Sequence, residues 1–386
     1  MLRNLESYCV RMNSPFSQER IASAHIMVVG CGALGNEVLK NLALLGAEHL
    51  TVVDFDRVEM GNLNRCVLFK KEDADAGRYK VDVVAGRLRE INPRMEIRSV
   101  CGDIAYDVGL GLLREMDVVI GCVDSRWARY CINRHCMRCG IPWVDGGIDL
   151  LEGTARVFRP GRNCYACNLG PEGLKDLARR MPCAGAIRRN EEAGKAPTTS
   201  VIASIIGAVE VQEALKLLHP ELLDSGEATS LCGQMFYYEG MNLTTRGVAF
   251  EAYDEGCAVH DRWEPVRKMP LAVRMTAAEA LQTIRDGLGQ EEVAFSLHDD
   301  CFIDFVEGRE QTVRRQVMRP GRAVADFVEQ DSELSGIPFS GLYQHEYRMI
   351  DRFFPYQTLT LAELGIPEHD VLQVTARRGD YYIETE

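Results

Sequence analysis

The sequence lacks the features that would assign it to a membrane or to nucleic acid. No apolar stretch reaches the roughly 18 residues that a bilayer-spanning helix needs, and the start of the chain is too polar for a secretory signal peptide. Basic residues are outnumbered, with 44 lysines and arginines against 57 acidic residues and a net charge of −13. Nucleic-acid binding needs an excess of cations on one face. We therefore expect a cytoplasmic protein with neither a membrane nor a nucleic acid as its partner.

Repeats and low-complexity tracts are also missing from the 386 residues. A chain of this length exceeds one ordinary core, so two domains are expected. Fourteen cysteines are present, but the cytosol keeps thiols reduced, which argues against a disulfide framework. Most of them should be small buried residues, such as Cys101, Cys122 and Cys131, and a few should be metal ligands or nucleophiles.

Strand and helix patterns alternate through the first half of the chain. This order predicts an α/β fold with a Rossmann-like, doubly wound, mostly parallel sheet and helices on both faces. A later helix is apolar on all sides and is expected to be buried. The predicted strands are 24–30, 50–56, 95–104, 117–125 and 141–148, and the predicted helices are 36–46, 79–92, 126–140 and 201–218.

The pattern changes near Arg262, where we place the boundary between a domain of residues 1–261 and a small α+β domain of residues 262–386. A capping box of Thr276 and Glu279 opens a helix in this second domain. Residues 356–386 predict a strand, one helical turn, a second strand and a tail.

Three glycines follow the first predicted strand. Gly30, Gly32 and Gly35 have the spacing of a phosphate-binding turn that opens a helix. Asp54 ends the next strand 19 positions after Gly35, where an acid that binds a ribose belongs in a dinucleotide fold. These residues alone fit a nicotinamide dinucleotide as well as ATP.

The residues after the turn favour ATP. Arg65 and Lys80 supply cations that a diphosphate on a helix N-terminus does not need, but that a departing pyrophosphate does. Asp124, at the end of a later strand, offers a hard oxygen ligand for magnesium. Asp56 and Asn62 belong to the same polar stretch. A single Arg or Lys is usually a solvated surface charge, but the ordered set after a glycine turn indicates a nucleotide triphosphate site.

Several motifs together resemble the adenylation domain of ubiquitin-activating enzymes and of their relatives MoeB and ThiF, the sulfur-carrier adenylyltransferases of molybdopterin and thiamine synthesis. The resemblance covers roughly residues 18–260. The motifs that carry it are GCGALGNEVLKNLALLG, VVDFDRVEMGNLNR, INP, GCVDSRWARYCIN, EGTARVFRPGRNCYAC and IIGAVEVQEALKLL.

The resemblance implies a role for each nucleotide-site residue. The three glycines shape the turn, Asp54 holds the ribose and Asp124 positions magnesium. The residues that contact the phosphates are then Asn62, Arg65 and Lys80. Cys66 departs from the glutamine that the family has after this arginine.

Two short pairs of metal-binding residues suggest a structural zinc site. Cys164 and Cys167 form a CxxC pair, and Cys257 and His260 form a second pair 90 positions later. The family normally has two cysteines in the second pair, but three thiolates and an imidazole also bind zinc. The first pair alone would fit a redox motif or two incidental thiols equally well.

Activating enzymes also need a nucleophile that forms a thioester. Cys183 lies in a segment that resembles the family's crossover loop, which we place at residues 164–200. Nearby cations lower the pKa of a thiol, and the alternative is a loop cysteine without a catalytic role. The flanking cations are Arg179, Arg180, Arg188 and Arg189.

The resemblance implies a reaction and its partners. ATP activates the C-terminus of a ubiquitin-like protein, Cys183 carries it as a thioester, and a conjugating enzyme accepts it. The end of the chain is similar to a β-grasp, which would recruit that enzyme. Single-domain relatives work as homodimers in which an arginine, here Arg11, crosses to the partner. Such compact enzymes also resemble those of bacterial ubiquitin-like conjugation operons linked to phage defence.

Other functions remain open at this point. A sulfur-carrier adenylyltransferase would use the same first step without the thioester hand-off. A nicotinamide dehydrogenase would release no pyrophosphate, and a scaffold that only binds a ubiquitin-like partner would not need the ATP-site residues.

Overall fold

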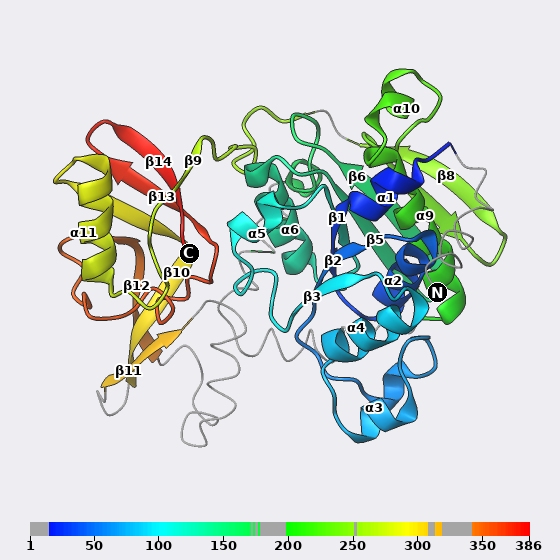
Figure 1. Ribbon diagram of the computed structural model, residues 1–386, viewed down its shortest axis with the longest axis horizontal. Helices are drawn as coiled ribbons and strands as arrows, with labels where there is room; N and C mark the ends of the chain where they lie inside the picture. Colours follow the sequence, from blue (N-terminus) through cyan, green and yellow to red (C-terminus); the bar gives the residue numbers. More distant parts are fainter. Residues whose placement is uncertain are drawn as a thin grey trace. The chain divides into compact units, whose positions relative to one another are not determined.

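The computed structural model describes residues 15–170, 173, 177, 198–250, 253–307, 313–318 and 342–386. The chain divides into two compact units, which Figure 1 shows. The first unit takes its residues from Met1–Ala105, Leu113–Gly170 and Ala196–Arg262. The second takes its residues from Tyr106–Leu112, Pro171–Lys195 and Trp263–Glu386.

An eight-stranded sheet forms the centre of the first unit, in the order β3-β2-β1-β4-β5-β6-β7-β8. The strands from β3 to β5 pair in parallel, and β6, β7 and β8 continue the sheet in antiparallel pairs. The order reverses between β1 and β4, which is the switch point of a Rossmann-like fold. This confirms the predicted fold class. The strands are β1 His25–Val29, β2 His49–Val53, β3 Glu96–Val100, β4 Val118–Gly121, β5 Trp143–Asp149, β6 Glu152–Phe158, β7 Gln234–Glu239 and β8 Thr244–Ala249.

Helices cover both faces of this sheet. Helices α2, α4 and α9 pack on one face, where they share a hydrophobic core with Ile26 and Val28. Helix α6 packs on the opposite face, where Ile132 lies beside Trp143 and Gly121. The helices of this unit are α1 Gln18–Ser23, α2 Ala33–Leu45, η2 Met60–Asn62, α3 Lys71–Asp75, α4 Lys80–Ile91, α6 Arg126–Cys139, η3 Ala166–Asn168, α9 Ser200–Leu217 and α10 Pro220–Asp224, and α5 Leu110–Arg114 has residues in both units.

The sequence signals explain where these helices begin and end. Helix α2 ends at Gly46, which adopts the left-handed conformation that glycine tolerates (φ 86°). Helix α4 ends at Ile91, two residues before Pro93, which cannot continue a helix. The Thr199 hydroxyl caps α9 by accepting a hydrogen bond from the Ile202 amide.

In the part of the second unit that the structure describes, helix α11 packs against a mixed sheet. Its strand order is β11-β10-β13-β14-β9, with β12 also paired to β10. The predicted capping box opens the helix, since Thr276 and Glu279 exchange side chain–backbone hydrogen bonds. This is the expected α+β architecture, and its β-grasp identity stays a prediction. The elements are β9 Val266–Lys268, α11 Ala277–Leu288, β10 Val293–Glu307, β11 Val313–Met318, β12 Leu342–Ile350, β13 Val371–Ala376 and β14 Gly379–Glu384.

The end of the chain differs from its prediction. The predicted tail is a strand, β14, which forms a hairpin with β13. Gly379 makes the turn with φ 123°, and the alternating side chains that follow it suit a strand. The strand predicted from residue 356 is instead a run of turns, and the predicted helical turn after it is a hydrogen-bonded turn closed by Thr360 and Glu363.

Within the described residues, no helix combines the length and the apolar character that crossing a membrane requires.

Candidate nucleotide and metal sites

The turn between β1 and α2 depends on two of its glycines for steric reasons. A Cβ on Gly30 would lie 2.5 Å from the carbonyl oxygen of Cys122, and one on Gly35 would lie 1.9 Å from the carbonyl oxygen of Gly30. Gly32 faces open space and caps α2 without a side-chain hydrogen bond. Amide groups of the first helical turn are therefore available to an anion, as in known phosphate-binding turns.

The carboxylate of Asp54 stabilises this turn. Its Oδ2 accepts a hydrogen bond from the Cys31 amide at 2.7 Å, and its Oδ1 accepts one from the Asp56 amide at 2.7 Å. Burial raises the pKa of Asp54 against the opposing attraction of Lys80. The acid is thus fixed at the end of β2, beside the glycine turn.

Lys80 starts helix α4, and its ammonium group lies 2.8 Å from Asp56. Burial acts to lower the pKa of Lys80, but the negative charges of Asp54 and Asp56 outweigh it and raise that pKa. Lys80 is therefore a charged, largely buried cation at physiological pH.

Asn62 and Arg65 belong to the polar segment after β2. The Asn62 side chain accepts a hydrogen bond from the Glu59 amide at 2.9 Å, and Arg65 donates to the carbonyl of Gly61. Arg65 is half-buried. Cys66 is buried, and burial raises the pKa of its thiol to about 11, so this thiol stays neutral. It is a packing residue rather than a nucleophile.

Asp124 lies between the end of β4 and the start of α6, with its side chain exposed. Because β1, β2 and β4 are parallel neighbours, the glycine turn, Asp54 and Asp124 all follow the carboxyl ends of strands at one edge of the sheet. Ligands of open α/β sheets bind at this edge. The structure thus brings the glycine turn, Asp54 and Asp124 to one edge, and Lys80 joins Asp54 there through Asp56.

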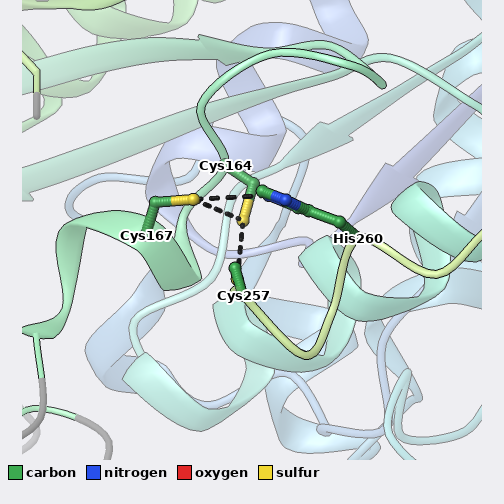
Figure 2. Close-up of side chains that lie close together, drawn as sticks. All are labelled: Cys164, Cys167, Cys257 and His260. Atoms are coloured by element: carbon green, nitrogen blue, oxygen red, sulfur yellow. Dashed lines mark hydrogen bonds between the residues drawn. The ribbon is translucent and has the colours of Figure 1, made fainter. Parts of the chain in front are cut away.

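A second site is formed by three cysteines and one histidine. Their ligand atoms all lie within 4.8 Å of one another, as Figure 2 shows. Cys164 and Cys167 follow β6, and Cys257 and His260 lie in the loop after β8. The site therefore ties together two segments that are about ninety positions apart in the sequence.

The dimensions of this cluster suit a tetrahedral zinc ion. The Cys164 sulfur lies 3.6 Å from that of Cys167 and 3.9 Å from that of Cys257, and the Cys167 sulfur lies 3.3 Å from Nε2 of His260. Zinc–sulfur bonds of about 2.3 Å in a tetrahedron separate two sulfurs by roughly 3.8 Å. Burial raises the pKa of Cys164 to about 12 and lowers that of His260. This donor set could hold zinc, with all four positions filled by protein.

Comparison with known proteins shows which family the chain belongs to. The ThiF family matches residues 5–259, well over half of the chain. The chain belongs to the ThiF family. The resemblance to the MoeB and ThiF branch of the ubiquitin-activating superfamily is thereby confirmed.

Individual relatives agree with the family. The chain is 33% identical over 236 residues to the SAMP-activating enzyme E1 of Haloferax volcanii, which covers 61% of this chain and 80% of that protein. It is 32% identical over 238 residues to the sulfur carrier protein adenylyltransferase of Thermus thermophilus. This match covers 60% of this chain and 80% of that protein. The crystal structure of E. coli MccB with succinimide has a TM-score of 0.51 at 20% identity, over 63% of this chain and 68% of that one. At this identity the structural match supports the ThiF-type fold alone.

Two predicted residues of the family's mechanism lie outside the described residues. These are Cys183, the predicted nucleophile, and Arg11, the predicted residue at a dimer interface. The four arginines that flank Cys183 in the sequence also lie outside them.

The structure adds a buried ion-pair network that the sequence did not suggest. Asp145 on β5 is fully buried, and its carboxylate contacts Nε of Arg129 at 2.7 Å and Nη2 of Arg156 at 2.8 Å. Nη2 of Arg129 also donates to the carbonyl of Gly146 at 2.8 Å. The available signal was an aspartate inside the apolar strand IPWVDGGI, where a charge needs a partner.

A second buried acid approaches β5 from the face that α9 covers. Glu210 is fully buried, and a Cβ on Gly146 would lie 2.4 Å from its carboxyl carbon. The sulfur of Cys122 lies 3.9 Å from one of its oxygens. Burial, with a further contribution from Asp145, raises the pKa of Glu210 well above its ordinary value.

Proposed function

We propose that the protein activates the C-terminus of a ubiquitin-like protein with ATP, holds it as a thioester on Cys183 and transfers it to a conjugating enzyme. The observation that carries the first step is the convergence of the glycine turn, Lys80 and Asp124 at one edge of a ThiF-type sheet. The names of the two curated relatives, an activating enzyme and a sulfur-carrier adenylyltransferase, agree with this chemistry.

In the first step, a carboxylate oxygen of the modifier attacks the α-phosphorus of ATP. The bond from this phosphorus to the bridging oxygen breaks, and pyrophosphate leaves with the electron pair. Lys80 and Arg65 stabilise the negative charge that builds up on the leaving group. Amides at the start of α2 bind phosphate oxygens, and Asp54 binds the ribose.

Magnesium fits the site because Asp124 offers an exposed carboxylate at the nucleotide edge. The ion would further neutralise the charge of the phosphates.

In the second step, the Cys183 thiolate attacks the acyl carbon of the adenylate. A carbon–sulfur bond forms, and AMP leaves as the carbon–oxygen bond breaks. The zinc that the Cys/His cluster would hold has a structural role.

A protein substrate is supported by an apolar rim at the sheet edge where the carboxyl ends of β4 and β5 lie, which is also the edge of the proposed nucleotide site. Its residues belong to the β5–β6 turn, the β7–β8 turn and the first turn of α9. The Gly240 amide donates a hydrogen bond of 3.0 Å to the Leu151 carbonyl and so joins the two hairpin turns. An exposed apolar group of this kind is typical of a surface that another protein covers. The rim consists of Leu150 (55% exposed), Leu151 (39%), Val201 (65%), Met241 (75%) and Leu243 (76%).

The second candidate is a sulfur-carrier adenylyltransferase, which shares the first step and makes no thioester for a conjugating enzyme. The Thermus thermophilus relative, which carries that name, is nearly as similar as the activating enzyme. The two candidates differ in whether Cys183 is needed as an acceptor. They also differ in whether residues 262–386 recruit a conjugating enzyme, which we assign to the first candidate.

Intact-mass measurement under non-reducing conditions separates the two. The protein is incubated with ATP, magnesium and a ubiquitin-like protein of the same organism. We expect an adduct of one modifier mass that thiols remove, and that Cys183→Ala loses while still releasing pyrophosphate. Cys101 is exposed rather than buried as predicted, and Cys101→Ala is the matched control that should keep the adduct. Pyrophosphate release without an adduct in any variant would favour the sulfur-carrier reaction, and no release at all would refute both.

A further inference from the structure

A contribution to the stability of the fold does not explain well why Asp145 and Arg129 form a buried ion pair. Removing a carboxylate wholly from water costs several kcal/mol, which an ion pair barely recovers, and apolar side chains of similar size often stabilise a fold as well or better. Asp145 is fully buried and contacts two arginines, of which Arg129 keeps only 11% of its side chain exposed. Such a network is better suited to fixing a position than to adding stability.

The element that this network holds is the first turn of α6. The amide of Arg129 donates to the Ser125 carbonyl at 3.1 Å, and the Ser125 hydroxyl accepts from the Ala128 amide at 3.4 Å, so this turn is closed and capped. Asp124 directly precedes the capping residue. The guanidinium of Arg129 is therefore linked, through one helical turn, to the backbone of Asp124.

The other side of the Asp124 segment is held by the sheet. The amide of Cys122 donates to the carbonyl of Val29 at 2.8 Å, at the end of β1. Gly121, the last residue of β4, pairs with Asp145 in the parallel register of β5. The residues from 122 to 125 thus lie between a strand end and a helical turn, both of which are fixed against β5.

We infer that Asp145 is a positioning residue of the nucleotide site, which acts through Arg129 to fix the first turn of α6 and thereby the carboxylate of Asp124. This inference rests on the proposed ATP-dependent function, in which Asp124 is a ligand of magnesium. Magnesium accepts little deviation from octahedral geometry, so a displaced carboxylate would bind it more weakly. Outer groups that orient metal ligands contribute about 10- to 100-fold to metal affinity or activity.

The chain contains a matched control for this network. Asp73 on α3 is also fully buried and also contacts two arginines, Arg78 at 3.2 Å and Arg87 at 3.4 Å. None of these residues belongs to the nucleotide site. Arg87 lies on α4, the helix that begins at Lys80, but not on the Asp124 segment, so Asp73→Asn reports what the loss of a buried aspartate between two arginines does when the Asp124 segment is untouched.

The test measures ATP binding by calorimetry with and without magnesium, on the full chain. The ratio of the two dissociation constants gives the coupling between the metal and the nucleotide. We expect Asp145→Asn to lower this coupling by about tenfold, whereas Asp73→Asn lowers the melting temperature but leaves the coupling unchanged. Arg129→Lys keeps the charge but loses the planar fork that contacts Asp145 and Gly146, so it should lower the coupling as well.

The outcomes separate this inference from the proposed function. Wild-type protein that binds no ATP would refute the proposed function. ATP binding with a coupling to magnesium that neither Asp145→Asn nor Arg129→Lys alters would overturn the positioning role alone. The double variant should lose no more coupling than either single variant, because both changes interrupt one connection. If Asp145→Asn does not fold, Arg129→Lys decides the question.

Discussion

The Nζ atom of Lys80 lies 2.8 Å from a carboxylate oxygen of Asp56, and the Lys80 amide donates to the Asp56 carbonyl at 2.9 Å. The lysine side chain is 10% exposed, whereas that of Asp56 is 52% exposed. Asp56 therefore holds an ammonium group in place at the rim of the proposed nucleotide site. Preplaced charge of this kind needs no reorganisation when pyrophosphate leaves.

Lys80→Met should remove this charge while keeping most of the buried stem. We expect pyrophosphate release to fall by about 10²- to 10³-fold, as when one stabilising donor is lost from an active site. Lys71→Met, which removes an exposed lysine paired with Asp75, should leave the rate unchanged. Equal rates for wild type and Lys80→Met, measured with saturating ATP and modifier, would show that Lys80 does not act on the leaving group.

Gly35→Ala should disrupt the glycine turn. The added Cβ would lie 1.9 Å from the Gly30 carbonyl oxygen, which belongs to backbone and cannot rotate away. We expect a loss of about 3 kcal/mol or more in the free energy of unfolding, with loss of ATP binding. Gly86→Ala, in the exposed middle of α4 with open space around it, should instead stabilise the fold by up to about 1 kcal/mol. Denaturant unfolding of both variants measures the contrast.

Local signals explain why much of the first unit could be predicted. The glycine turn, the Gly46 cap and the stop before Pro93 each depend on neighbours in the sequence, and each has a steric cause. The two halves of the Cys/His cluster were also visible, because the spacing within each pair is fixed by the geometry of metal binding.

The features that the sequence did not suggest depend on strand register. Asp145 meets Arg156 only because β5 and β6 form an antiparallel pair, which is a non-local result. The strand β14 forms a local hairpin with β13, but its pairing with β9 joins segments more than a hundred residues apart. Local periodicity carries no information about such pairings.

Substitution in the Cys/His cluster should remove its metal. We expect wild-type protein to contain about one zinc per chain, in line with four protein ligands. Cys257→Ser should lose the metal and lower the melting temperature, because the site ties the loop after β8 to the segment after β6. His260→Cys keeps four ligands and should retain it, and Cys232→Ser, a half-buried cysteine outside the cluster, should behave as wild type. Metal analysis of purified protein would contradict the assignment if Cys257→Ser kept its zinc.

Glu210 should make the free energy of unfolding fall as the pH rises, whereas an acid that is stabilised in its ionised form makes it rise. Burial, and then the charge of Asp145, raise the pKa of Glu210 in the folded state well above 4.5. Between 4.5 and that higher value, the folded protein retains a proton that the unfolded chain has released. The free energy of unfolding therefore falls as the pH rises, by up to about 1.4 kcal/mol per pH unit from this group.

Glu210→Gln removes this titration and keeps the shape of the side chain. We expect the variant and wild type to be similar in stability near pH 4.5, and the variant to become the more stable of the two as the pH rises toward neutrality. Glu115→Gln, which changes an exposed acid, should show no such divergence. Denaturant unfolding at several pH values measures the difference. A constant difference between wild type and Glu210→Gln across this range would mean that the folded state does not hold the extra proton, and that Glu210 is ionised in the core.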